Sequence, residues 1–282
     1  MRPGLVVSDL DGTLLDPGGA LSSGNLMAAS ELAAAGIPLI LATGRSYYES
    51  RFVLDAIPSC PLVIGAAGAL LSHAGTGETL DRELLEVGLI ESLTQLILEE
   101  GHLVQLLQDR SSTEEDYLLV GTAAPHPTMD WWLELHDLAS HRVETLEEVD
   151  LSHTVRIGVV GGPSELEALT ERIRTAYHDR LVIRHWQGVS ERDDRPTYLL
   201  ELFNRGVDKW SMIRKVMDQR GLVPGEVVAI GDGLNDIQML KEAGLGIAMG
   251  QATDRVKAVA DRVVSGNHQD GFAEAIRGLL GS

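Results

Sequence analysis

Two aspartates one residue apart, Asp9 and Asp11, are the first side chains of the sequence suited to chemistry. They follow the apolar run Leu5–Val7, which is typical of a buried strand, and Gly12 allows the chain to turn away after them. Residues i and i+2 of an extended segment point to the same side, so both carboxylates are expected to face one site. A divalent cation or a shared proton would relieve their repulsion, and carboxylate oxygens suit a hard ion such as Mg²⁺. Taken alone, the stretch is also compatible with an acidic turn that ends a strand.

A second polar group, Thr43 and Gly44, follows the apolar segment 38–42 and precedes a predicted helix. A hydroxyl group and free backbone N–H groups at a helix start are suited to holding an anion. Asp208 is expected to cap a later helix that Lys209 begins, and Lys209 is the natural cation beside such an anion. The pattern therefore predicts donors for a negatively charged ligand.

A third polar group, Asp232 and Asp236, follows the apolar segment 227–230. Ligands of open α/β sheets bind beyond the carboxyl ends of the parallel strands. Because all three groups come directly after predicted strands, their loops are expected to converge on one acidic, metal-binding site.

Apolar segments alternate with predicted helices in the two outer parts of the chain, which indicates a parallel sheet covered on both faces. The middle of the chain mixes helix, strand and proline-rich stretches, and segment 122–128, which contains two prolines, is expected to be irregular. The predicted fold is α/β, with a core domain formed by 1–83 and 196–282 and an α+β domain inserted at 84–195.

The composition narrows the classes of protein and partner. The 282-residue chain is 44% hydrophobic and has no apolar run long enough to span a membrane, which is typical of a soluble globular protein. With a formal net charge of −19, neither nucleic acid nor an anionic membrane is expected as a partner. Cys60 is the single cysteine and no secretory leader is evident, so a cytoplasmic location is expected. No oligomeric state is predicted.

Four segments of the chain resemble the four signatures of the haloacid dehalogenase (HAD) superfamily of phosphohydrolases. Asp9–Leu14 is similar to the first signature, Ala42–Arg45 to the second, Gly206–Lys209 to the third and Gly231–Asp236 to the fourth. Their order and spacing resemble the Cof-type branch, subfamily IIB. The resemblance implies a Rossmann-like core with a C2-type α+β cap domain inserted between the second and third signatures. It covers both flanks of the chain, whereas the middle matches only in size and rhythm.

The resemblance also implies residue roles. Asp9 would be the nucleophile that forms an aspartyl-phosphate, and Asp11 the general acid and base. Mg²⁺ would be held by the carboxylates of Asp9 and Asp232 and the backbone carbonyl of Asp11, with Asp236 as a ligand or support. Donors to the transferring phosphoryl group would come from Thr43, Gly44 and Lys209.

Other positions match the Cof-type pattern less closely. Ala67 stands where an asparagine is common, which removes an amide near the expected phosphate, and Gln251 also stands where an asparagine is usual. Asn235 and Asn267 match as supporting residues, although both also suit turns. Arg45 is expected either to pair with an acidic neighbour or to contact a phosphate.

The function implied by the resemblance is a Mg²⁺-dependent phosphatase that hydrolyses small phosphate monoesters, such as sugar phosphates, through an aspartyl-phosphate. The alternatives are a sugar phosphomutase or phosphotransferase on the same scaffold, and a weakly active regulator that binds phosphorylated metabolites. The partner in each case is a small phosphorylated metabolite, chosen by the inserted domain. Candidate substrate-reading side chains in that domain are His102, Arg110, His126, Arg184, His185, Trp186, Arg192 and Arg195.

Overall fold

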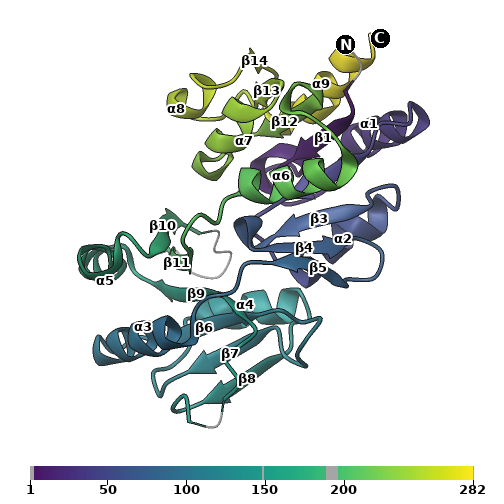
Figure 1. The fold of residues 1–282 in the computed structure, drawn as a ribbon. Coiled ribbons are helices and arrows are strands. Elements are labelled where there is room, and N and C mark those ends of the chain that lie inside the picture. The colour runs from purple at the N-terminus through teal and green to yellow at the C-terminus, as the bar shows by residue number, and fades with distance from the viewer. Residues whose placement is uncertain (1–2, 148, 189–195, 282) are drawn as a thin grey trace. The chain divides into compact units, whose positions relative to one another are not determined.

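The computed structural model describes residues 3–147, 149–188 and 196–281, and its chain divides into two units (Figure 1). The core unit comprises Met1–Asp81 and Asp208–Ser282, and the inserted unit comprises Arg82–Val207. The chain returns from the inserted unit to the core unit between Val207 and Asp208, later than the expected boundary between 195 and 196. The reason is that β11 (Tyr198–Asn204) pairs with strands of the inserted unit rather than with the core sheet.

The core unit is built on an eight-stranded sheet in the order β14-β13-β12-β1-β2-β3-β4-β5. The pairs from β14 to β3 are parallel, and β4 runs antiparallel to β3. The strands are β1 (Leu5–Ser8), β2 (Leu39–Ala42), β3 (Leu62–Gly65), β4 (Leu70–His73), β5 (Thr79–Arg82), β12 (Val227–Gly231), β13 (Leu245–Ala248) and β14 (Arg262–Val263).

Helices cover both faces of the core sheet (Figure 1). Successive strand residues point to opposite sides, and the central strands β1, β2 and β12 are mostly apolar, so both faces carry apolar side chains that need cover. Val6 packs with α1, α2 and α9, whereas Leu5 and Val7 pack with α6, α7 and α8. The helices are α1 (Ser23–Ala34), α2 (Tyr47–Ala56), α6 (Lys209–Arg220), α7 (Ile237–Glu242), α8 (Asp254–Lys257) and α9 (Gly271–Leu280). Shorter helical turns span Leu10–Leu14, Ala66–Gly68, Pro224–Glu226, Leu234–Asp236 and Asn267–Gln269.

Side-chain caps fix where three of these helices begin. The Ser22 side chain accepts a hydrogen bond from the backbone of α1, and Ser46 forms a capping box with Glu49 at the start of α2. Asp208 accepts a hydrogen bond from Ser211 N over 2.8 Å, so α6 begins at Lys209 as the sequence predicts.

The inserted unit contains a six-stranded sheet in the order β10-β11-β9-β6-β7-β8. Its other strands are β6 (Val104–Gln108), β7 (Tyr117–Val120), β8 (Ser140–Val143), β9 (Thr154–Gly161) and β10 (Leu181–Gln187). Its helices are α3 (Val87–Glu99), α4 (Pro127–Leu135) and α5 (Pro163–Tyr177). Apolar residues of α3 and α5 pack with alternate residues of the central strands to form a separate core.

Two regions differ from the sequence-based expectation. Segment 122–128 is not irregular throughout, because α4 begins within it at Pro127. Proline suits the first turn of a helix, where its missing N–H has no helical partner to lose. The strand β8 was not predicted, because its first three residues are exposed and carry no apolar alternation.

Candidate active site

Three loops of the core unit begin at the same edge of its sheet. Ser8, near the end of β1, pairs in register with Leu41 on β2 and with Ile230 on β12. Since these strands are parallel and level, Asp9 and Asp232 follow neighbouring strand ends, as the sequence predicts.

A cluster of three carboxylates lies at this edge. One oxygen from each of Asp9, Asp232 and Asp236 falls within 4.8 Å of the others. The Nζ atom of Lys209 donates to Asp9 Oδ1 and, over 2.6 Å, to Asp236 Oδ1. Lys209 and Asp236 are fully buried and Asp9 is nearly so. We call these four residues the carboxylate cluster; three negative groups in it face one positive group.

Burial and mutual repulsion disturb the protonation of the carboxylate cluster. Burial, and secondarily the charge of Asp236, raises the pKa of Asp9 well above its ordinary value despite the opposing effect of Lys209. The same two causes raise the pKa of Asp232. For Lys209 the lowering effect of burial is outweighed by the charges of Asp236 and Asp9, and its pKa is raised. Surplus carboxylate oxygens with raised pKa values are a donor set that fits a hard divalent cation such as Mg²⁺.

Backbone and side-chain donors fix the carboxylates in place. Asp236 Oδ2 accepts from the backbone N–H groups of Asp232 and Gly233, over 3.0 and 2.8 Å. Asp232 Oδ1 accepts from Thr13 Oγ1 over 3.0 Å. Gly12 has φ +78° and lies against the Asp232 carboxylate, so a side chain at this turn would collide with it.

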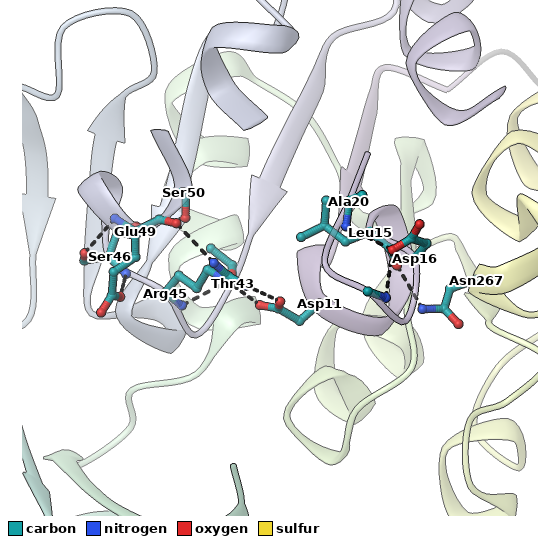
Figure 2. Close-up of polar contacts among 11 residues, drawn as sticks. Asp11, Leu15, Asp16, Ala20, Thr43, Arg45, Ser46, Glu49, Ser50 and Asn267 are labelled. Carbon is teal, nitrogen blue, oxygen red and sulfur yellow. Dashed lines mark hydrogen bonds and ion pairs between the residues drawn. The ribbon is translucent and has the colours of Figure 1, made fainter. Parts of the chain in front are cut away.

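Asp11 does not point at the carboxylate cluster. Its carboxylate instead pairs with Arg45, with Nη2 to Oδ1 at 2.6 Å and Nε to Oδ2 at 2.8 Å (Figure 2). The Asp11 side chain therefore lies outside the carboxylate cluster, paired with Arg45. Although β1 ends at Ser8, Asp9 and Asp11 both have extended backbone angles, with φ −64° and ψ 165° for Asp9 and φ −74° and ψ 126° for Asp11.

The loop after β2 lies between the turn Leu10–Leu14, which follows β1, and the loop after β3, because β2 is between β1 and β3 in the sheet. Thr43 is fully buried; its N–H donates to Ile64 O over 2.8 Å, and its Oγ1 accepts from Arg45 N over 3.2 Å. A Cβ atom built on Gly44 meets nothing within 4 Å, so this loop is open at Gly44. Ala67 donates its N–H to Thr43 O over 2.8 Å from a left-handed conformation with φ +59°.

The supporting residues lie in two turns of the core unit. Asn267 donates from Nδ2 to Leu15 O over 2.9 Å (Figure 2), and its N–H donates to Gln251 Oε1 over 3.0 Å. Gln251 Nε2 in turn donates to Gly12 O over 2.5 Å and lies 3.3 Å from Asp232 Oδ2. Gln251 thus contacts the site directly, which the sequence signalled only as a departure from a family pattern. Asn235 is half-buried in the turn before α7.

In the inserted unit, His102 and His126 both line a cavity of about 560 Å³. His126 also caps α4, because its Nδ1 accepts from Thr128 N over 3.2 Å. The unpaired Nε2 atom of His185 is buried, with no hydrogen-bond partner among the described residues.

The other expected substrate-reading residues of the inserted unit make contacts within that unit. Arg110 pairs with Asp116 over 2.9 Å, Trp186 Nε1 donates to Glu201 over 3.0 Å, and the Arg184 guanidinium lies 5.1 Å from the Phe203 ring centre. Arg192 and Arg195 lie outside the described residues.

Comparison with protein families decides the identity of the chain. A family model described as haloacid dehalogenase-like hydrolase matches residues 6–276. The chain belongs to this family. A solved haloacid dehalogenase-like hydrolase from Bacteroides thetaiotaomicron aligns with a TM-score of 0.82 at 25% identity, covering 99% of this chain and 100% of that one. The resemblance and the α/β fold with an inserted cap domain, both predicted from the sequence, are confirmed.

Curated relatives add the reaction class. The chain is 27% identical over 273 residues to the 5-amino-6-(5-phospho-D-ribitylamino)uracil phosphatase YcsE of Bacillus subtilis, covering 97% of this chain and 94% of that protein. It is 29% identical over 286 residues to the chloroplastic endoribonuclease YBEY of Arabidopsis thaliana, covering 96% of this chain but only 45% of that protein. The chain thus spans less than half of the latter relative. The family makes the protein a HAD-like hydrolase, and relatives such as YcsE and the phosphoglycolate phosphatase of Methanopyrus kandleri are named phosphatases. Within its described residues, no helix is both long and apolar enough to cross a bilayer.

Proposed function

We propose that this HAD-like hydrolase is a Mg²⁺-dependent phosphatase that hydrolyses small phosphate monoesters, such as sugar phosphates, through an aspartyl-phosphate on Asp9. The observation that supports the proposal is the carboxylate cluster, in which three acids meet Lys209, the first residue of α6. Such a surplus of buried negative charge is costly unless a cation or a function requires it.

Asp9 is the nucleophile. One of its carboxylate oxygens forms a bond to phosphorus while the bond between phosphorus and the leaving oxygen breaks. Lys209 holds Asp9 Oδ1 and supplies positive charge beside the phosphoryl oxygens. Asp9, Asp232, Asp236 and the backbone carbonyl of Asp11 would hold Mg²⁺, which would supply further charge neutralisation for the phosphoryl group.

The loop after β2 contributes donors. Thr43 is the first residue after β2 and Gly44 has open space beside it, which supports both as donors to phosphoryl oxygens. Asn267 and Gln251 join neighbouring turns by hydrogen bonds, and Gln251 contacts both Gly12 and Asp232. Asn235, in the turn before α7, is proposed as a further supporting residue.

Asp11 moves the protons. It donates a proton to the leaving oxygen in the first step and takes a proton from the attacking water in the second. The oxygen of that water forms a bond to phosphorus as the bond between Asp9 and phosphorus breaks, and inorganic phosphate leaves. The products are an alcohol and phosphate, and Asp11 ends in its starting protonation state.

The substrate is a small phosphorylated metabolite. The named relative YcsE acts on a phosphate ester of a ribityl chain, which supports a primary phosphate of a sugar or polyol as the substrate class. The inserted unit is proposed to select that metabolite, with His102 and His126 beside its 560 Å³ cavity as the first candidates.

The test is hydrolysis of 4-nitrophenyl phosphate by the full chain with Mg²⁺, with EDTA, and by the Asp9→Asn variant. The proposal expects phosphate release that requires Mg²⁺ and is lost in Asp9→Asn, while Asp55→Asn, an exposed carboxylate on α2, keeps the wild-type rate. Release that persists in EDTA would contradict the metal requirement. Transfer of the phosphoryl group to added sugar in preference to water would instead support the phosphotransferase alternative.

A further inference from the structure

Arg45 makes a two-point contact with Asp11. Its Nε donates to Asp11 Oδ2 over 2.8 Å and its Nη2 donates to Asp11 Oδ1 over 2.6 Å (Figure 2). Because both oxygens meet one guanidinium, the contact fixes the plane of the carboxylate as well as its position. The Asp11 side chain is 52% exposed and that of Arg45 only 12%, so a mostly buried cation orients a half-exposed carboxylate.

Arg45 itself is fixed by its surroundings. Its N–H donates to Thr43 Oγ1 over 3.2 Å, and its carbonyl accepts from Ala66 N over 2.8 Å. Its Nη1 lies 3.3 Å from Glu49 O, and its guanidinium lies 5.6 Å from the ring centre of Phe52 (Figure 2 shows the Thr43 and Glu49 side). The loop after β2 and the first turns of α2 therefore hold the arginine that holds Asp11.

We propose that Arg45 is a positioning residue, which holds the Asp11 carboxyl group where its proton reaches the leaving oxygen of the phosphate ester. The inference rests on the proposed function of Asp11. As the bond from Asp9 to phosphorus forms and the bond from phosphorus to the leaving oxygen breaks, the proton passes from Asp11 to that oxygen. Arg45 keeps its own protons throughout and does not touch the reacting atoms.

The leaving group separates positioning from a merely structural role. 4-Nitrophenolate departs without much help from an acid, whereas phenolate depends on protonation. Loss of an oriented acid therefore slows the phenyl ester more than the nitrophenyl ester, although the two substrates have nearly the same shape. A general loss of folding or phosphate binding would slow both esters alike.

The experiment compares kcat/KM for the two esters in the full chain with Mg²⁺. Arg45→Met is expected to lower kcat/KM for phenyl phosphate by about 100-fold, and that for 4-nitrophenyl phosphate by less than about threefold. Arg45→Lys keeps the charge but loses the two-point contact, so it should recover about tenfold of the phenyl phosphate loss. The matched control is Arg51→Met on α2, whose exposed pair with Asp55 spans 3.7 Å and which should leave both esters unchanged.

A double variant tests whether Arg45 acts through Asp11. In an Asp11→Asn background, Arg45→Met should add no further preference for the nitrophenyl ester, because the group that it positions is already gone. Equal losses on both esters, a faster phenyl phosphate reaction in Arg45→Met, or additive effects in the double variant would overturn the inference. A wild-type chain that hydrolyses neither ester would overturn the proposed function and this inference together, whereas equal losses overturn the inference alone.

Discussion

The core unit and the inserted unit each bury charged groups, but the two groups are composed differently. The carboxylate cluster of the core sets three carboxylates against Lys209. In the inserted unit, Arg156 pairs with Glu201 over 2.7 Å and also donates to the Tyr117 hydroxyl over 2.6 Å. Glu201 accepts a further hydrogen bond from Trp186, so among the described residues this group sets one cation against one anion, with neutral partners beside them.

The difference separates a structural charge pair from a functional one. A buried one-to-one pair with complete hydrogen bonds offsets much of its own desolvation cost. A surplus of buried carboxylates cannot, and the pKa values of Asp9 and Asp232 are raised by burial and repulsion as a result. Binding a cation would offset the surplus negative charge of the carboxylate cluster, as Arg156 offsets the charge of Glu201 in the inserted unit.

Removing the cation should lower activity in the core unit and stability in the inserted unit, and the loss of activity should be the larger change. Lys209→Met removes the positive charge beside the phosphoryl group and should lower kcat/KM for 4-nitrophenyl phosphate by about 10²–10³-fold. Steady-state kinetics with Mg²⁺ measure it. A variant within a few fold of wild type would show that the lysine is structural, like Arg156, and would break the comparison.

Arg156→Met should instead change stability. It leaves Glu201 buried without its cation, and about 3–5 kcal/mol of unfolding free energy should be lost. Urea unfolding measures the loss, and the double variant Arg156→Met/Glu201→Leu, which removes both charges, should recover most of it. If the double variant is no more stable than the single one, the pair is not balanced in the way proposed.

Asp232→Asn removes one of the surplus charges from the core cluster. The metal-free variant should melt at a higher temperature than metal-free wild type, while the stabilisation by Mg²⁺, about 2.7 kcal/mol at roughly 100 times its Kd, should largely disappear. Thermal unfolding over a Mg²⁺ titration provides both numbers. An unchanged Mg²⁺ response would remove Asp232 from the ligand set.

The raised pKa values predict how acidity affects the metal-free protein. A carboxyl group whose pKa is raised in the folded state binds more protons folded than unfolded, so stability falls as pH rises through the folded-state pKa. The gain in melting temperature on adding Mg²⁺ should therefore be larger at neutral pH than near pH 5. Equal gains at both pH values would indicate that these carboxylates are not the groups that Mg²⁺ relieves.

The last and smallest predicted change concerns backbone strain at two alanines of the core unit. Ala66 and Ala67 beside the Thr43 loop have φ values of +46° and +59°, which are unfavourable for residues with a Cβ. Ala67→Gly should therefore cost at least about 1 kcal/mol less than Ala29→Gly on helix α1, where glycine is disfavoured. Chemical denaturation of the two variants gives the difference, and equal costs would mean that the loop carries no strain.

Much of the site is local in origin and could be predicted from the sequence. Asp9 and Asp232 follow short apolar strands, and Asp208 caps the helix that presents Lys209, so each position follows from its own neighbours. The direction of Asp11 could not be predicted, because it depends on a turn at Leu10–Leu14 and on a partner 34 positions away in sequence.

Long-range contacts and exposed edges account for the rest. Gln251 reaches Gly12 across 239 positions, and only the completed sheet brings them together. The edge strand β8 is held by pairing with β7, and its exposed residues carry no apolar pattern of their own. The strand Tyr198–Asn204 belongs to the inserted sheet through its pairing with β9 and β10, which no local pattern indicates.

The most direct test of the central claim is chemical trapping of the phosphorylated residue. The full chain with Mg²⁺ and 4-nitrophenyl phosphate is quenched during turnover and treated with borohydride, which reduces an acyl phosphate to an alcohol, and the reduced residue is located by peptide mass spectrometry. Reduction is expected at Asp9, only when substrate is present, and not in Asp9→Asn. Reduction at Asp11 or another carboxylate, or hydrolysis by Asp9→Asn at the wild-type rate, would contradict it.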